Sequence, residues 1–325
     1  MKVAFAGSFA AQLAEPVRER LKAPCEIVTG DEIGILDELG DADVLVSMRF
    51  DNAMACAGPR LRLVQVPGAG LDRIDRSQLR PGLALANAFG HEVGIAEYTI
   101  GAMIALTRSF GRLDQKLRSG QWESQWALGA PGPPLWPELA GKTLGILGFG
   151  HIGEALARRA RAFDMRICAI RRQAQTKAPD GVTFVAGPER LDDVLRSSDY
   201  LAITLSLSDD TRGLLDRRRL ALMKPSAYLV NVARAEIIDE RALYRALAGG
   251  RLAGAALDVW YRYPTSAGNA TPSTEPFHRL DNVIMTPHIS GWTQGMFEAR
   301  VNVIAENIAR SVRGQPPLNA VAGTG

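Results

Sequence analysis

The sequence predicts an α/β protein with two doubly wound parallel sheets, one in each of two domains. Short apolar segments of strand length alternate with helix-like segments along nearly the whole chain, and the connections between them are short. The length of 325 residues is enough for two domains, each with a sizeable core.

The first hundred residues predict a small parallel sheet with covering helices. The first strand is expected at residues 2–6, and a helix follows it at residues 11–21. Strands separated by helix-like segments favour parallel pairing over hairpins. The further strands are expected at residues 26–29, 44–48, 61–66 and 83–87.

One long helix is expected from about residue 94 to residue 118. Apolar side chains cover most of its surface, which indicates burial between two units. A proline-rich stretch at residues 131–137 then interrupts regular structure. With Trp126 and Trp136 nearby, this stretch fits a solvent loop and a packed arm against a partner subunit equally well.

The alternation of strands and helices resumes at residue 143 and continues to residue 287. A final helix is expected at residues 294–314, and its return to the N-terminal unit would make that domain discontinuous. The predicted domains are therefore residues 1–98 with 290–325, and residues 99–289. Strands are expected at residues 144–148, 166–170, 182–185, 200–205, 227–231, 254–258 and 282–286.

A glycine-rich turn follows the expected strand at residues 144–148. It has the Gly-x-Gly-x-x-Gly spacing, and a helical pattern follows it at residues 154–163. Such glycines allow a tight turn, a close backbone approach to a pyrophosphate, and close packing of the helix on the strand. The phosphates would then face the N–H groups at the start of that helix. The residues expected at the dinucleotide are Gly148, Gly150, His151, Ile152 and Gly153.

Two arginines indicate which dinucleotide is preferred. Arg171 and Arg172 end the next strand, where an NAD site would place an acidic residue. A carboxylate there accepts from the ribose hydroxyls of NAD, whereas guanidinium groups can bind a 2′-phosphate through two hydrogen bonds. The prediction is NADP, with NAD possible and a solvated loop as the alternative interpretation.

Composition excludes several other classes. Hydrophobic content of 46% and charged content of 22% are ordinary for a soluble globular protein. The net charge of +3 and the dispersed arginines give little support for nucleic-acid binding, and no apolar run has the length of a membrane span. Cys25, Cys56 and Cys168 fit a reducing cytoplasm and core positions, and their spacing argues against a metal site or a disulfide framework.

Three side chains are candidates for chemistry because each follows an expected strand, where open α/β sheets bind ligands. The guanidinium of Arg234 could hold a substrate carboxylate and polarise an adjacent carbonyl. Asp258 could accept a hydrogen bond from a nicotinamide carboxamide. For His288, a structural and a catalytic role are equally consistent with the sequence.

Taken together, these motifs resemble the D-isomer-specific 2-hydroxyacid dehydrogenase family, and the resemblance covers nearly the whole chain. The matching segments occur in the family's order, at residues 66–70, 74–75, 96–97, 148–153, 211–213, 231–234, 256–259 and 286–288. The resemblance implies a flavodoxin-like substrate domain and a Rossmann nucleotide domain that flank a cleft. It also implies a homodimer, and a small 2-keto acid such as glyoxylate or hydroxypyruvate as substrate.

The resemblance further implies roles for individual residues. Arg234 would bind the substrate carboxylate and keto oxygen, and His288 would protonate that oxygen as hydride arrives. His91 lies near the substrate in the family, although a capping or interdomain role fits it equally well. The loop of Gly68, Ala69 and Gly70 would offer N–H groups to the carboxylate. The cofactor channel would include Ser206, Thr211, Val232, Ala233 and Gly291.

The sequence departs from the family at one catalytic position. Tyr263 stands where the family carries a glutamate that hydrogen-bonds the histidine. A carboxylate would raise the histidine pKa, whereas a phenol can orient the ring but adds little charge stabilisation. Three interpretations follow. The first is a 2-keto acid reductase with a lower pH optimum, and the second is a formate- or phosphite-type dehydrogenase that needs no proton transfer. The third is a nucleotide-sensing binding protein, as in the transcriptional corepressors of this fold.

Overall fold

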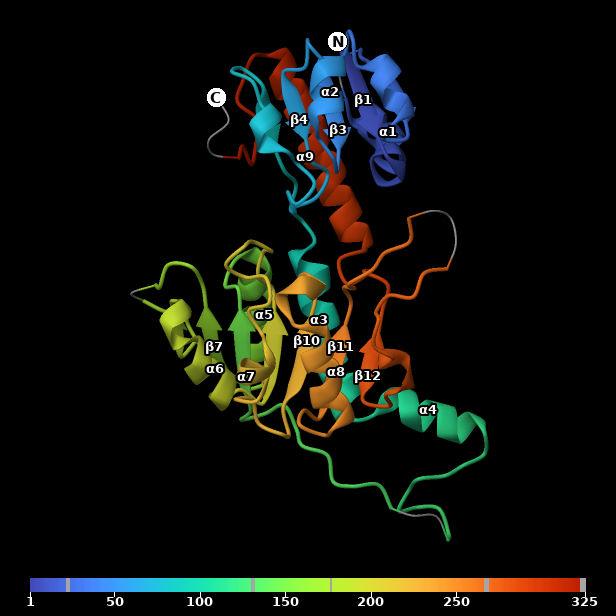
Figure 1. The fold of residues 1–325 in the computed structure, drawn as a ribbon, viewed down its shortest axis with the longest axis vertical. Coiled ribbons are helices and arrows are strands. Elements are labelled where there is room, and N and C mark those ends of the chain that lie inside the picture. Colours follow the sequence, from blue (N-terminus) through green and yellow to red (C-terminus); the bar gives the residue numbers. More distant parts are fainter. Residues whose placement is uncertain (22–23, 130–131, 176, 266–268, 322–325) are drawn as a thin grey trace. The chain divides into compact units, whose positions relative to one another are not determined.

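A computed structural model of the chain describes residues 1–21, 24–129, 132–175, 177–265 and 269–321 (Figure 1). The chain forms two compact units, an N-terminal unit (Met1–His91 with Thr293–Gly325) and a central unit (Glu92–Trp292). The sequence-based boundaries, after residues 98 and 289, differ from these by a few residues. The difference at the first boundary arises because the helix expected from residue 94 begins at Glu92 and packs wholly in the central unit.

The N-terminal unit contains a five-stranded sheet in the order β2-β1-β3-β4-β5, with every neighbouring pair parallel. This is the flavodoxin-like strand order, so the predicted class of this sheet is confirmed. The strands are β1 (Lys2–Ala6), β2 (Glu26–Gly30), β3 (Val44–Ser47), β4 (Leu63–Gln65) and β5 (Ala84–Ala86).

Helices cover both faces of this sheet, because successive side chains of a strand point to opposite faces. Val3 and Phe5 of β1 pack in one cluster with α1 (Ser8–Arg20) and α9 (Gln294–Val312). Ala4 and Ala6 pack in a second cluster with α2 (Asn52–Ala57). The C-terminal helix α9 therefore completes the N-terminal unit.

The central unit contains a seven-stranded parallel sheet in the order β12-β11-β10-β9-β6-β7-β8. The order reverses between β6 and β9, as in a Rossmann sheet, so the predicted class is confirmed here too. The strands are β6 (Thr143–Leu147), β7 (Arg166–Ile170), β8 (Phe184–Ala186), β9 (Tyr200–Ile203), β10 (Tyr228–Asn231), β11 (Gly254–Leu257) and β12 (Val283–Met285).

The helices of the central unit divide between the two faces of its sheet. One face packs against α3 (Glu92–Thr107) and α5 (His151–Arg161) through a cluster that includes Leu144 and Ile146. The other face packs against α6 (Leu191–Ser197), α7 (Arg217–Leu220) and α8 (Glu240–Ala248) through a cluster that includes Leu147. The described helices include none that is long and apolar enough to cross a membrane.

Some expectations for local structure are wrong. The helix expected at residues 94–118 is two helices, α3 and α4 (Phe110–Arg118), because Ser109 between them adopts a left-handed conformation with φ of 52°. Of the three cysteines, only Cys168 is buried, whereas Cys56 is exposed. In the proline-rich stretch, by contrast, residues 132–137 have no regular structure, as expected, and residue 131 lies outside the described residues.

Candidate active site

The glycine turn connects β6 to α5 at the point where the strand order reverses. Gly148 has a φ of 105°, and a Cβ there would lie 2.7 Å from the backbone of Thr204. A Cβ on Gly153 would lie 2.5 Å from the carbonyl oxygen of Gly148. Both positions therefore require glycine. Gly148 needs it for its backbone conformation and for the close approach of the segment after β9, and Gly153 needs it so that the helix can pack on the turn.

The start of α5 fits a phosphate group. Gly150 is the N-cap residue, and no side chain caps the helix. A Cβ on Gly150 would meet no atom within 4 Å, so the space in front of the helix is open. Uncapped N–H groups and the helix dipole favour an anion at this position. The turn therefore fits the pyrophosphate of a dinucleotide.

The two arginines expected at the ribose directly follow β7, beside this turn. The backbone N–H of Arg171 donates to Ala186, which holds the start of the loop against β8. Arg172 is exposed. Neither guanidinium forms a hydrogen bond or ion pair with another residue in the part of the chain that the structure describes. Both remain available to an anionic ligand.

The loop after β9 is closed by the hydroxyl of Thr211. This hydroxyl donates to the carbonyl oxygen of Ser206 at 2.8 Å and accepts from the N–H of Ser208 at 2.8 Å. The structure thereby brings Ser206 and Thr211, both expected at the cofactor, into one fixed loop at the carboxyl edge of the sheet.

The loop that carries Arg234 is fixed by Asn231 at the end of β10. The amide of this asparagine donates to the carbonyl oxygen of Arg234 at 2.9 Å and accepts from the N–H of Ala233 at 3.1 Å. Asn231 is buried, as are Val232 and Ala233, whereas Arg234 is partly exposed. The backbone turn at Arg234 is therefore fixed, and the guanidinium itself donates to the carbonyl oxygen of Ala233 at 2.7 Å. Sequence reasoning named Asn231 only as part of a motif and missed this role.

Asp258, directly after β11, is fully buried and organises the loop that carries His288. Its carboxylate accepts from the N–H of Ile289 at 2.9 Å and from the N–H of Ser290 at 2.8 Å. It also accepts from the hydroxyl of Thr286 at 2.6 Å. These bonds hold His288 in a left-handed conformation with φ of 59°, which is uncommon for a residue other than glycine.

A chain of hydrogen bonds links this carboxylate to α3. The hydroxyl of Tyr98 lies 2.6 Å from that of Thr286 and donates to it, because Thr286 gives its own proton to Asp258. Burial raises the pKa of Tyr98, so this proton is retained. The indole of Trp260 donates to the carbonyl oxygen of Thr286 at 2.8 Å.

Tyr263 contacts the imidazole of His288 directly. The phenolic oxygen lies 2.9 Å from Nδ1, and it also accepts from the N–H of Trp260 at 3.3 Å. Loss of hydration and the positive charge of Arg234 lower the pKa of His288, and Asp258 opposes this effect. Burial raises the pKa of Tyr263. At neutral pH both rings are therefore uncharged.

The contact between Tyr263 and His288 is compatible with both tautomers of the neutral imidazole. The phenol can donate to an unprotonated Nδ1, and its oxygen can also accept from Nδ1–H beside the bond from Trp260. In the first arrangement the imidazole proton lies on Nε2, where the ring presents a hydrogen-bond donor.

Comparisons with known proteins identify the family. Residues 100–290 match the model of the NAD-binding domain of D-isomer-specific 2-hydroxyacid dehydrogenases. The chain is 36% identical over 292 residues to a glyoxylate reductase of Pyrococcus furiosus, an alignment that covers 88% of this chain and 84% of the relative. The chain belongs to the D-isomer-specific 2-hydroxyacid dehydrogenase family. It is therefore an oxidoreductase that uses a nicotinamide cofactor.

Other members of the family agree with this assignment. The chain is 35% identical to a glyoxylate reductase of Thermococcus kodakarensis, over 88% of this chain and 85% of the relative. A solved structure of an NADPH-dependent glyoxylate/hydroxypyruvate reductase from Sinorhizobium meliloti superposes with a TM-score of 0.81. That structure is 27% identical and covers 99% of this chain and 98% of its own.

Within this dehydrogenase, the structure brings only some of the expected site residues together. Arg234, Asp258, Tyr263 and His288 meet in the central unit, where the charges of Arg234 and Asp258 act on the imidazole. The glycine turn, the 206–211 loop and Gly291 belong to the same unit. The expected substrate residues Gly68, Ala69, Gly70 and His91 belong to the N-terminal unit.

Three residues that support the site could hardly be recognised from the sequence. Tyr98 and Trp260 are aromatic residues in apolar surroundings, and Thr286 belongs to a short motif in which His288 is the obvious candidate. Their hydrogen bonds to one another and to Asp258 join segments up to 188 residues apart. Tyr98 follows directly after the motif at residues 96–97, which was the one available hint.

Proposed function

We propose that this protein reduces small 2-keto acids, glyoxylate or hydroxypyruvate, with NADPH as the hydride donor. The observation that carries the proposal is that Arg234 and His288 meet in the central unit. Both follow strands of the same parallel sheet that carries the glycine turn, at its carboxyl edge. The activity of the related glyoxylate reductases supports this substrate class.

Arg234 would bind the substrate. Its guanidinium can donate two parallel hydrogen bonds to the carboxylate of a 2-keto acid, which also orients the adjacent carbonyl. The turn made by Asn231 fixes the backbone of Arg234, and the bond from the guanidinium to the carbonyl oxygen of Ala233 restrains the side chain before substrate binds. When bound, the nicotinamide supplies the hydride for the keto carbon.

His288 would supply the proton. In the neutral ring Nε2–H can donate a hydrogen bond to the keto oxygen, and in the imidazolium form the same proton can transfer to that oxygen as its negative charge develops. The phenolic oxygen of Tyr263 then accepts a hydrogen bond from Nδ1–H. Since a phenol carries no negative charge, reduction is expected to be fastest below neutral pH.

Cofactor preference would come from Arg171 and Arg172. We expect NADPH to be preferred over NADH, and an R171D/R172A variant to lose on the order of 100-fold in kcat/KM for NADPH, because it removes two charge-assisted contacts to the 2′-phosphate. Arg166, exposed at the start of the same strand, provides the control variant R166D. A wild-type preference for NADH would contradict this proposal.

A second candidate activity is oxidation without proton transfer, as for formate or phosphite. It is favoured by the neutral hydroxyl of Tyr263 beside His288, because such a reaction requires no imidazolium. A panel of glyoxylate, hydroxypyruvate, pyruvate, phenylpyruvate, formate and phosphite, tested with each cofactor across pH, separates the two activities. Absence of turnover with every substrate would favour the nucleotide-sensing interpretation.

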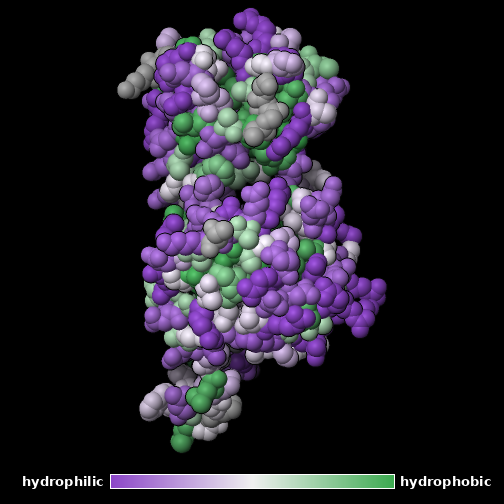
Figure 2. Space-filling view, turned by 90° about the vertical axis from the view of Figure 1, so that its left-hand side faces the viewer, coloured by the Kyte–Doolittle hydropathy of each residue, from purple (hydrophilic) through white to green (hydrophobic). Residues whose placement is uncertain are grey.

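A homodimer is proposed from the segment between α4 and β6. Trp126 is 89% exposed, and Leu128 and Leu135 are fully exposed. Figure 2 shows hydrophobic side chains on this projecting segment, and Figure 1 shows it extending away from its sheet. Its root is fixed by Glu123, whose pKa is lowered to about 2 by hydrogen bonds from Arg112 and Lys116. An anchored arm with exposed apolar side chains fits a second copy of the chain.

The substrate contacts of Gly68, Ala69, Gly70 and His91 stay predictions. Gly68 and Ala69 lie in the loop after β4, where their carbonyl oxygens accept hydrogen bonds from Ala88 and Asn87. These bonds involve carbonyl oxygens of the loop. They are therefore compatible with the proposal that its N–H groups bind an anionic substrate.

A further inference from the structure

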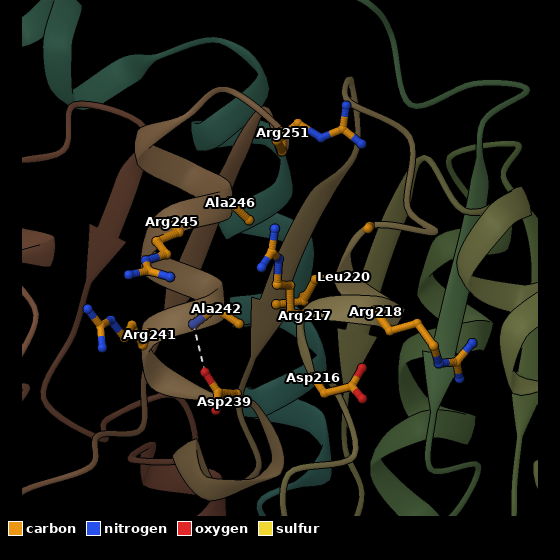
Figure 3. Close-up of a pocket in the computed structure, with 11 residues that line it drawn as sticks. Asp216, Arg217, Arg218, Leu220, Asp239, Arg241, Ala242, Arg245, Ala246 and Arg251 are labelled. Atoms are coloured by element: carbon orange, nitrogen blue, oxygen red, sulfur yellow. Dashed lines mark hydrogen bonds between the residues drawn. The ribbon is translucent and has the colours of Figure 1, made fainter.

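A wide groove lies between α7 and α8, on the face of the central sheet opposite α3 and α5 (Figure 3). Its volume is about 1050 Å³, and none of its lining residues belongs to the candidate active site. Small-molecule sites in proteins have volumes of about 300–1,000 Å³, so the groove is large enough for a ligand of nucleotide size.

Two neighbouring turns form one end of this groove. Leu215 and Ile238 pair in an isolated parallel bridge, and Asp216 and Asp239 follow them directly. Each aspartate caps the helix that it precedes, with Asp216 accepting from the N–H of Arg219 and Asp239 from the N–H of Ala242. The bridge therefore sets α7 and α8 side by side.

The lining of the groove is strongly basic. Five arginines and two aspartates line it, which leaves a net charge of +3. Each aspartate uses one carboxylate oxygen in its helix cap, which holds its charge at the end of the groove. The arginines are Arg217, Arg218, Arg241, Arg245 and Arg251.

In the part of the chain that the structure describes, three of the five guanidinium groups have no protein partner. Arg218 pairs with Asp192 at 2.8 Å, and Arg241 lies 4.0 Å from Glu275. Arg217, Arg245 and Arg251 are exposed and form no side-chain hydrogen bond or ion pair within the described ranges of the chain. In the view of Figure 3, Arg217 lies between Arg245 and Arg218, whose guanidinium groups point away from it to either side.

This arrangement is unfavourable for the protein alone. Arg241 and Arg245 are four residues apart on α8, where like charges repel each other across one helical turn, and Glu275 at 4.0 Å from Arg241 offsets part of this repulsion. The floor of the groove consists of short or buried apolar side chains from the facing helices, so nothing there compensates the charge. An anion would remove this repulsion. The floor residues are Leu220, Ala221, Ala242 and Ala246.

We propose that this groove binds a small molecule that carries two or more phosphate groups. Guanidinium groups match phosphate oxygens through paired hydrogen bonds, and several of them around one apolar floor suit linked phosphates. An extended nucleic acid fits less well. The whole chain has a net charge of +3, equal to that of the groove lining, so the rest of the molecule offers no net positive track.

Inorganic tripolyphosphate is a suitable probe, used on protein saturated with NADPH so that the glycine turn is occupied. Calorimetric titration should give one tripolyphosphate per chain. Its dissociation constant should increase at least about tenfold in R217A/R245A, because charge-assisted hydrogen bonds are lost. The control variant R60A/R76A removes two exposed arginines of the N-terminal unit and should bind as the wild type does.

Unchanged NADPH affinity will show that each variant is folded, and the single variant R251A gives a second, independent test of the groove. Absence of saturable binding, or equal weakening in R217A/R245A and R60A/R76A, would overturn the proposal. A short DNA duplex is the last ligand to be tested. If the duplex binds and the groove variants weaken it while tripolyphosphate does not bind, the groove serves a nucleic acid and the proposed ligand class is wrong.

Discussion

Replacing Tyr263 with glutamate should shift the pH range of the reduction upward. The phenolic oxygen lies 2.9 Å from Nδ1 of His288, so a carboxylate there would place its charge about 4 Å from that of an imidazolium. At an effective dielectric constant of about 20 this pair would gain about 4 kcal/mol. Tyr263 is 48% exposed, however, and solvent screening reduces the gain to about 1.4 kcal/mol.

A gain of about 1.4 kcal/mol corresponds to about one pKa unit for His288. The sign follows from the reaction. Reduction requires the imidazolium, which is lost as pH rises through the pKa of His288, and in the wild type that pKa is lowered from its ordinary value. Y263E should therefore move the descending limb of the pH profile upward by about one unit and raise turnover at pH near 8 by about tenfold.

The assay is NADPH oxidation with glyoxylate, measured as kcat against pH in the wild type, Y263E and Y263Q. Glutamine supplies a neutral acceptor of similar size, so it controls for the loss of the phenol. If the descending limb of Y263E stays where it is in the wild type, or moves to lower pH, His288 is not the proton donor or Tyr263 does not act on it.

Two further predictions concern the framework of the site and the projecting arm. D258N should lower the free energy of unfolding by about 1–3 kcal/mol. An amide cannot accept from all three groups that now donate to the carboxylate, so a buried donor is left unpaired. Calorimetry checks this prediction, and an unchanged Tm would contradict it. W126E/L135E should convert the proposed dimer to a monomer in light scattering after gel filtration, with unchanged NADPH affinity. A wild type that is itself monomeric would refute the proposed role of the arm.

The fold was largely predictable because apolar strand segments recur at regular intervals along the chain. Both sheet classes are confirmed, since strands such as β6 and β10 are buried runs flanked by clear turn residues. Boundaries were less predictable. The prediction of one helix at residues 94–118 missed the break at Ser109, because a serine side chain does not indicate a left-handed backbone.

The chemistry of the site was predictable only where a motif carried it. The glycine turn was found from its spacing, since Gly148 and Gly153 are required by contacts that any larger side chain would block. The support around Asp258 was not foreseen, because it depends on hydrogen bonds between residues that are distant in sequence and close only in the folded sheet. Local pattern carries no information on such contacts.

The most direct test of the proposed function is kcat/KM for glyoxylate with NADPH, compared among the wild type, R234A and H288A. We expect turnover by the wild type and a loss of about 100-fold or more in each variant, since one removes the carboxylate contact and the other removes the proton donor. Near-wild-type kcat/KM in R234A, or in H288A, would contradict the assignment of these residues. No turnover by the wild type would contradict the proposed reaction itself.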